Sequence, residues 1–283
     1  MNQRRQILIL MLPPAAWLVA LLLIPIGTMA VFTFRAGTFG PSSHQFTLDT
    51  YRAFIVNVDF HRLLLRSFGI ASVVSVLSVV LAYPVAYVLS FQAGQHRVAL
   101  LTALIIPAWT SYLLRVLAWK IMLGPSGMIN ELLIGLGVTH QALPVLLYNR
   151  WAVVITLVYS WIPFVALPIF AALERIDRSL LESAADLGAA RWQSFLRVTL
   201  PLSLPGVAAA FLFVFIPTVG EYVTPALVGG PTGIMYGNII QDQFLSSLDW
   251  PMGSLMSLAM LMVVLLPLLV VSRFVRLSEL AGL

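Results

Sequence analysis

The chain has 283 residues, of which 60% are hydrophobic and only 10% are charged, and its mean hydropathy is +0.97. An ordinary soluble domain has about half apolar and about a quarter charged residues, so this composition excludes one. The formal net charge is +5, there is no cysteine, and the single lysine, Lys120, follows tryptophan rather than glycine. A disulfide framework, a thiolate nucleophile and a phosphate-binding GxxxxGK[ST] loop are therefore excluded as well.

Long uncharged stretches dominate the chain. A helix needs about 20 apolar residues to cross a bilayer. Six stretches meet this length: Ile7–Phe34, Ser67–Phe91, Val98–Leu123, Trp151–Leu173, Val198–Gly220 and Pro251–Ser272. They predict an all-α membrane protein with six transmembrane helices in a single membrane domain, residues 1–283. The first stretch is too long for a signal peptide and no small-x-small cleavage site follows it, so we expect it to be retained.

The distribution of arginines indicates an orientation, because short cytoplasmic loops hold an excess of Arg and Lys. With the N-terminus inside, the cytoplasmic set is Arg4, Arg5, Arg97, Arg175, Arg178, Arg191, Arg197, Arg273 and Arg276, against Arg35, Arg52, Arg62, Arg66 and Arg150 outside. We therefore predict that both termini of this multi-pass membrane protein are cytoplasmic. The net positive charge then reflects topology rather than nucleic-acid binding, because the sequence contains no basic stripe.

The third stretch carries two charges, Arg115 and Lys120. Their insertion cost roughly cancels the gain from its apolar residues. Insertion requires Lys120 to reach the outer interface and Arg115 to face the bundle or a wet cavity. Arg115 then either donates to neighbouring carbonyls or belongs to a solute pathway. The outside segments 35–66 and 124–149 are each predicted to contain a short helix.

The longest interior loop, residues 174–201, joins the fourth and fifth stretches. Its apolar residues recur at helical spacing on both sides of a glycine: Leu180, Leu181, Ala184, Ala185 and Leu187, then Gly188, then Trp192, Phe195, Leu196 and Thr199. This pattern predicts two short amphipathic helices that meet at a glycine turn, with Asp177 or Ser179 as the first N-cap. Pro201 and Pro205 are expected to end the second helix.

The same loop carries a family motif. The spacing of Glu182-Ser183-Ala184, Gly188 and Val198-x-Leu200-Pro201 resembles the EAA loop of ABC importer permeases, E-A-A-x3-G-x9-I-x-L-P, with serine and valine as substitutions. The stretches "SWIPFVALPIFAALERIDRSLLESAADLGA" and "GEYVTPALVGG" resemble those of spermidine/putrescine-type permeases.

This resemblance implies a type I importer (MetI-like) permease fold, a location in a bacterial inner membrane, and a transport subunit that is not an enzyme. It also implies a heterodimer with a second homologous permease, two ATP-binding subunits that hold ATP and Mg, and an extracytoplasmic substrate-binding protein. No cofactor is expected on this chain itself. The residues expected to couple it to the ATPase are Glu182, Ser183, Ala184, Asp186, Gly188 and Ala189.

A polyamine is a flexible polycation, so its passage through a membrane needs carboxylates and aromatic faces. The predicted pathway consists of Glu221, Asp242, Trp109, Tyr112, Tyr159, Trp161 and Tyr222. Two other interpretations remain open: each aromatic residue anchors or packs a helix, and Glu221 caps one. The "VTPALVGGPTG" segment after Glu221 is either a hinge or a plain connector.

Other functions compete with polyamine import. The same importer class carries other solutes, such as 4-aminobutyrate, an opine, an amino acid or ferric ion, and a secondary transporter or channel would work without an ATPase. An intramembrane enzyme is disfavoured because the sequence has neither HExxH nor GxSxG, and its histidines fall in loops or at span ends: His44, His61, His96 and His140.

Overall fold

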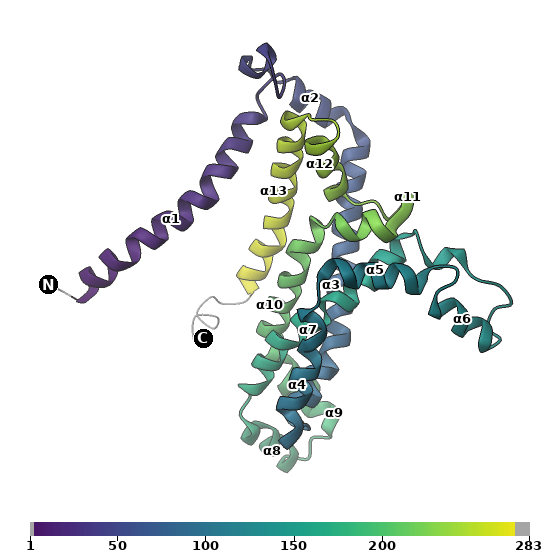
Figure 1. The fold of residues 1–283 in the computed structure, drawn as a ribbon. Helices are drawn as coiled ribbons and strands as arrows, with labels where there is room; N and C mark the ends of the chain where they lie inside the picture. Colours follow the sequence, from purple (N-terminus) through teal and green to yellow (C-terminus); the bar gives the residue numbers. More distant parts are fainter. Residues whose placement is uncertain (1–2, 275–283) are drawn as a thin grey trace. The chain divides into compact units, whose positions relative to one another are not determined.

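The computed structural model describes residues 3–274, and helices make up its regular structure (Figure 1). Within this range no strand forms, and the one extended pairing is an isolated bridge between Arg35 and Phe46. The prediction of an all-helical fold is therefore confirmed. Of the arginines used to orient the chain, Arg276 lies outside the described residues.

The long helices are α1 (Gln3–Phe32), α3 (Val58–Phe91), α7 (Arg150–Glu174), α10 (Leu200–Val219) and α13 (Trp250–Phe274). The shorter ones are α2 (Asp49–Val56), α4 (Arg97–Ile105), α5 (Tyr112–Leu123), α6 (Met128–Gly135), α8 (Arg178–Asp186), α9 (Arg191–Ser194), α11 (Gly230–Gly233) and α12 (Tyr236–Leu245). Among the described residues, 5 helices are long and apolar enough to cross a membrane, or 6 if one bent pair counts as a span. The short helices expected in the two outside segments are α2 and α6.

The third predicted span is not one straight helix. The helical segments Gly94–Trp109 and Tyr112–Gly135 meet at a bend of 87°. Pro107 lies in a 3-10 turn, and the following Thr110 is extended with ψ 152°. Proline lacks the N–H that would continue the helical ladder, so the chain leaves the helix at this point. The insertion sum for a straight span therefore does not apply, because Arg115 and Lys120 lie on the separate helix α5.

The described chain divides into two units, which we treat separately. The first comprises the chain up to Arg62 together with Ile239–Val263, and the second comprises Leu63–Asn238 and the chain from Val264 onward. In the first unit, aromatic residues surround Trp250, whose ring centroid lies 5.5 Å from that of Phe32 and 6.3 Å from that of Phe244. The Thr38 hydroxyl donates to the Leu248 carbonyl at 2.6 Å and accepts the Trp250 N–H at 2.9 Å.

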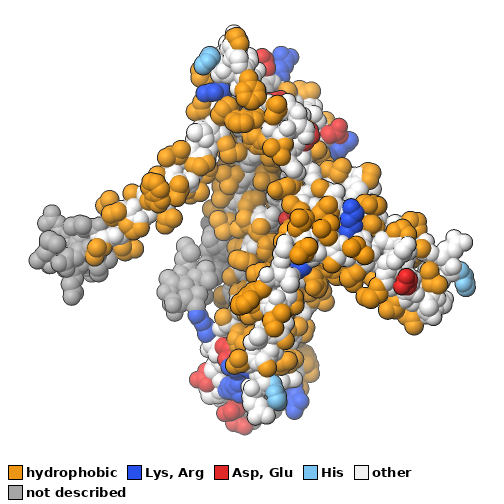
Figure 2. Space-filling view, viewed as in Figure 1, with side chains coloured by type: hydrophobic (Ala, Val, Ile, Leu, Met, Phe, Trp, Pro, Cys, Tyr) orange, Lys and Arg blue, Asp and Glu red, His pale blue; other side chains and the backbone are white. Residues whose placement is uncertain are grey.

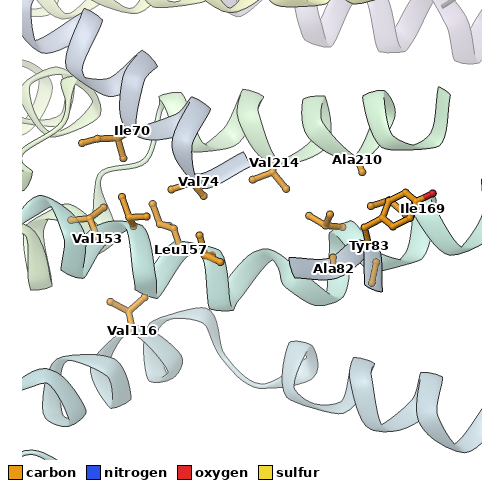
Figure 3. Close-up of a cluster of buried hydrophobic side chains, with 14 of the residues drawn as sticks. Ile70, Val74, Ala82, Tyr83, Val116, Val153, Leu157, Ile169, Ala210 and Val214 are labelled. Carbon is orange, nitrogen blue, oxygen red and sulfur yellow. The ribbon is translucent and has the colours of Figure 1, made fainter. Parts of the chain in front are cut away.

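The second unit holds a core formed mainly by α3, α7 and α10 (Figure 3). Val74 of α3, Leu157 of α7 and Val214 of α10 are fully buried there. The Tyr83 hydroxyl reaches from α3 to the Ser203 hydroxyl of α10 at 2.8 Å. Helices α7 and α10 pack side by side, which fixes both ends of the segment that joins them.

Close contact between α7 and α10 depends on Gly206. A Cβ atom at this position would lie 2.3 Å from the Ala172 Cβ and 2.9 Å from the Pro168 carbonyl oxygen. Neither atom belongs to a flexible side chain, so Gly206→Val must separate the helices. We expect a loss of about 1–3 kcal/mol or more of stability, measured as a lower melting temperature of the detergent-solubilised protein. Gly69→Ala is the control, because a Cβ at Gly69 has no neighbour within 4 Å; equal melting of the two variants would contradict this packing.

Candidate coupling surface and solute pathway

Helix α8 begins directly after the end of α7, and Asp177 is its N-cap. The Asp177 Oδ1 accepts the backbone N–H of Ser179 at 3.0 Å, so of the two predicted caps the structure selects Asp177. This backbone hydrogen bond lowers the pKa of the Asp177 carboxyl below its usual value. The cap is thus ionised near neutral pH, and its contribution to α8 is lost only as the pH falls through that lowered pKa.

The turn after α8 has the geometry that requires glycine. Gly188 has φ +81°, a left-handed conformation that is strained for residues with a Cβ. Its N–H donates to the Ala185 carbonyl at 2.8 Å, and the Ala189 N–H donates to the Ala184 carbonyl at 3.0 Å. These two bonds form a Schellman motif, which ends α8 and turns the chain toward α9.

Around this turn, apolar side chains stand in the open. Leu187 is 88% exposed, Trp192 64% and Leu180 46%. Glu182 and Asp186 lie beside them and are also exposed. Figure 2 shows charged side chains gathered around this end of the second unit, below helices covered with hydrophobic ones. We call the exposed part of residues 180–192 the α8–α9 surface; exposed apolar groups rimmed by charge are typical of a protein-binding site.

Hydrogen bonds connect the base of this surface to three other helices. The carbonyl of Ser90, at the end of α3, accepts Arg178 Nη2 at 3.3 Å and Arg97 Nη2 at 3.1 Å. Arg97 also forms an ion pair with Glu174 at 2.6 Å. The ends of α3, α4, α7 and α8 therefore share one network of hydrogen bonds.

Breaking this network is expected to weaken coupling. The side chains of Arg97 and Glu174 are each 31% exposed, so we assign the pair about 1 kcal/mol. Arg97→Glu and Glu174→Arg should each reduce solute uptake about fivefold, and the double exchange should restore most of it. Uptake at equal membrane expression measures this. If the double variant lost as much uptake as the two single variants combined, the ion pair itself would not contribute to coupling.

The sequence predicted that the second helix of this loop ends at Pro201 and Pro205. This prediction is wrong, because the helix that begins with α9 continues past both prolines. It passes through a π-helical turn, Phe195–Thr199, into α10, and the continuous helix Arg191–Val219 is long and apolar enough to cross a membrane. Pro201 falls in the first turn of α10, where a missing N–H is tolerated.

Glu221 follows the end of α10 and holds the chain that comes next. Its Oε1 accepts the N–H groups of Val223 and Thr224 at 2.9 and 3.1 Å, which is the capping role left open above. The Thr224 hydroxyl in turn lies 2.5 Å from the Tyr112 hydroxyl of α5. The Tyr112 hydroxyl also interacts with the Glu221 carboxylate itself, so the structure brings together two residues of the predicted pathway.

Sequence reasoning missed Asn238 at this site. Its Nδ2 donates to the Tyr222 carbonyl at 2.7 Å, while its Oδ1 accepts the Met235 N–H at 3.0 Å. Gly237 beside it has no room for a Cβ, which would lie 2.5 Å from the Gly220 carbonyl oxygen. The start of α12 therefore braces the backbone around Glu221. An asparagine paired with a backbone carbonyl and a backbone N–H leaves no periodic signal in a sequence.

Arg115 lies near this cluster. Its Nη1 donates to the Ser160 carbonyl at 3.3 Å, and its guanidinium carbon lies 5.9 Å from the centre of the Tyr112 ring. Of the two interpretations of Arg115, donation to a neighbouring carbonyl is therefore observed. Lys120 lies 5.9 Å from the centre of the Tyr148 ring, next to the loop that precedes α7.

The other predicted pathway residues do not form one cluster. Tyr159 packs against Trp119 at 5.4 Å, whereas Trp161 packs against Phe213 at 6.2 Å. Residues two apart on a helix point to different sides, which explains the separation. Trp109 is 87% exposed on its 3-10 turn and Tyr222 is 44% exposed. Asp242 belongs to the first unit, where its carboxylate accepts the Ser247 hydroxyl at 3.3 Å.

Comparison with known proteins identifies the family. Residues 4–280 match the model of the family described as binding-protein-dependent transport system inner membrane component. The chain belongs to this family. It is therefore a multi-pass permease subunit of an ABC importer in the inner membrane, a transport component rather than an enzyme.

Several named relatives of this permease are similar over most of its length. It is 38% identical over 232 residues to the spermidine/putrescine transport system permease protein PotB of Escherichia coli (strain K12), which covers 82% of this chain and 84% of that protein. The PotB protein of Haemophilus influenzae is 33% identical over 91% of this chain and 90% of its own length. The molybdenum transport system permease protein ModB of Azotobacter vinelandii is 30% identical over 57% of this chain.

Solved structures show the fold of this permease. A chain from a bacterial ABC transporter involved in the import of alginate superposes with a TM-score of 0.73 and 19% identity, covering 97% of this chain and 98% of that chain. A chain of the MetNI methionine ABC transporter in an inward-facing conformation superposes with a TM-score of 0.57 and 20% identity, covering 78% of this chain and 98% of that one. The prediction of a MetI-like permease fold is confirmed.

Proposed function

We propose that this permease moves polyamines, such as spermidine and putrescine, across the inner membrane by alternating access. Relatives named as spermidine/putrescine permeases are 33–38% identical over 82% or more of the chain, and this observation carries the proposal. The site agrees with a cationic solute, because the Glu221 carboxylate lies beside the Tyr112 hydroxyl and has no cationic partner within 4.0 Å among the described residues.

The α8–α9 surface is the proposed docking site for an ATP-binding subunit. Its apolar residues, Leu180, Leu187 and Trp192, would fill a groove on that partner, and Gly188 keeps them in place. ATP and Mg belong to the partner, and we propose no cofactor on this chain. Closure of two such partners would move α8, and the shared carbonyl of Ser90 would pass that motion to α3 and α4.

We propose the complete transporter to contain a second, homologous permease, two ATP-binding subunits and an extracytoplasmic binding protein. Residues 1–283 act as a single membrane domain in this assembly. Both termini are proposed to be cytoplasmic, which places the α8–α9 surface on the side where ATP is available. This agreement between charge distribution and coupling surface supports the orientation.

The identity of the cargo can be tested by measuring ATP hydrolysis of the reconstituted transporter. In proteoliposomes, binding protein loaded with spermidine is expected to raise ATP hydrolysis several-fold over unloaded protein, because a bound cargo shifts the transporter toward its closed state. Binding protein incubated with 4-aminobutyrate should not. Stimulation by 4-aminobutyrate and not by spermidine would retain the importer and reject the polyamine.

A further inference from the structure

A groove of about 940 Å³ separates α3 from α7 at the end of α7 opposite the α8–α9 surface. The walls that α3 and α7 supply are apolar, with spacings of three and four residues on each helix, and Asn149 and Thr232 add polar groups to the lining. The apolar walls are formed by Gly69, Ile70 and Val73 of α3 and by Trp151, Val154 and Ile155 of α7. Figure 3 shows Ile70 and Val153 at the same end of the buried core that the two helices share.

Two arginines line the mouth of this groove. Arg66 lies one helical turn before Gly69, and Arg150 is the first residue of α7. Both side chains are exposed, and among the described residues neither has a carboxylate within 4.0 Å. Arg62, one turn earlier on α3, differs because it pairs with Asp59 at 3.6 Å. The groove therefore presents two unpaired positive charges above an apolar floor.

We propose that this groove binds an anionic phospholipid, with its phosphate between Arg66 and Arg150 and an acyl chain along the apolar walls. Guanidinium groups suit phosphate oxygens, with which they form paired, charge-assisted hydrogen bonds. Gly69 leaves space for the chain, because a Cβ there would have no atom within 4 Å. Trp151 lies next to Arg150, whose guanidinium carbon is 5.6 Å from the centre of its ring, an arrangement typical of the membrane interface.

The positive charge of the groove favours an anionic phospholipid over a polycationic solute or an apolar helix of a second subunit. Two arginines repel a polycation, so the groove does not suit the proposed cargo. An apolar helix of a second subunit would fill the walls but leave both guanidinium groups without a counter-ion. An anionic lipid matches the walls and the mouth together. The inference does not depend on which solute the transporter carries.

The test uses the complete transporter in nanodiscs that contain a phosphatidylglycerol analogue with a photoreactive group on its acyl chain. After illumination, labelled peptides are expected to contain residues 66–73 or 150–155. Unlabelled phosphatidylglycerol should compete, and phosphatidylcholine should not. Each arginine near a membrane surface contributes about a fivefold gain in binding to anionic lipid. Arg66→Gln with Arg150→Gln should thus reduce labelling by about tenfold or more.

Matched variants separate the groove from general charge effects. Gly69→Phe keeps both arginines but fills the space, so labelling should fall by about as much, whereas Gly69→Ala should retain it. Arg62→Gln removes a neighbouring positive charge outside the groove and should leave labelling unchanged. All variants should keep the basal ATP hydrolysis of the assembly, which shows that they fold. Equal competition by phosphatidylcholine, or no labelling of these peptides in the intact transporter, would overturn the proposal.

Discussion

Gly188→Val is expected to reduce solute uptake at least tenfold while the protein remains in the membrane. A left-handed residue with a Cβ costs about 1–2 kcal/mol, and a β-branched one costs more. About 1.4 kcal/mol is enough for a tenfold change. The substitution removes the two hydrogen bonds that turn the chain after α8, so Leu187 and Trp192 lose their positions on the α8–α9 surface. Uptake of labelled solute and cargo-stimulated ATP hydrolysis both measure the loss.

Two controls make this prediction specific. Gly188→Asn should keep most uptake, because asparagine tolerates the left-handed conformation at the end of a helix. Gly137 has a similar φ of +70° and equally open surroundings, but it follows α6. Gly137→Val therefore introduces the same backbone strain away from the α8–α9 surface and should leave uptake nearly unchanged. If the two valine variants were equally impaired, strain alone rather than coupling would explain the loss.

Glu221→Gln is expected to lower uptake of a cationic solute by about ten- to a hundredfold. A hydrogen bond to a charged group contributes about 1.5–3 kcal/mol, which corresponds to this range. Glutamine retains an Oε1 that accepts the Val223 and Thr224 N–H groups, so the local cap survives and only the negative charge is lost. Uptake measured at several solute concentrations would show whether the variant transports more slowly or binds more weakly.

Glu131→Gln is the control for Glu221. Glu131 is an exposed glutamate on α6, so its neutralisation removes the same charge without touching the residues near Tyr112. Uptake should remain close to that of the unmodified protein. Full uptake by Glu221→Gln at equal expression would leave Glu221 with a capping role only and would remove it from the solute pathway.

The local features of the α8–α9 segment were predictable from sequence. Helical spacing on each side of Gly188 indicated two helices, and glycine indicated the turn, because short-range sterics determine both. The Asp177 cap followed from the same local chemistry. The continuation of α9 into α10 was not predictable, because a proline favours a helix end and periodicity gives no sign of a π turn that continues the helix.

Features that depend on distant backbone groups were also missed. The Ser90 carbonyl and Asn238 act through contacts with residues far away in the sequence, so neither leaves a pattern of its own. The pathway prediction selected residues by type, without knowing to which side of its helix each side chain points. It grouped Tyr159 with Trp161 although the two contact different partners, and it assumed a straight helix through Pro107, where the chain bends by 87°.

Competition in whole cells tests the central claim most directly. Cells that produce the complete transporter would be given labelled spermidine with an excess of unlabelled putrescine, 4-aminobutyrate or an amino acid, in parallel with cells carrying Gly188→Val. We predict uptake that polyamines alone suppress and that Gly188→Val abolishes. Uptake of neither polyamine by an intact assembly, or polyamine uptake that persists in Gly188→Val, would contradict the account.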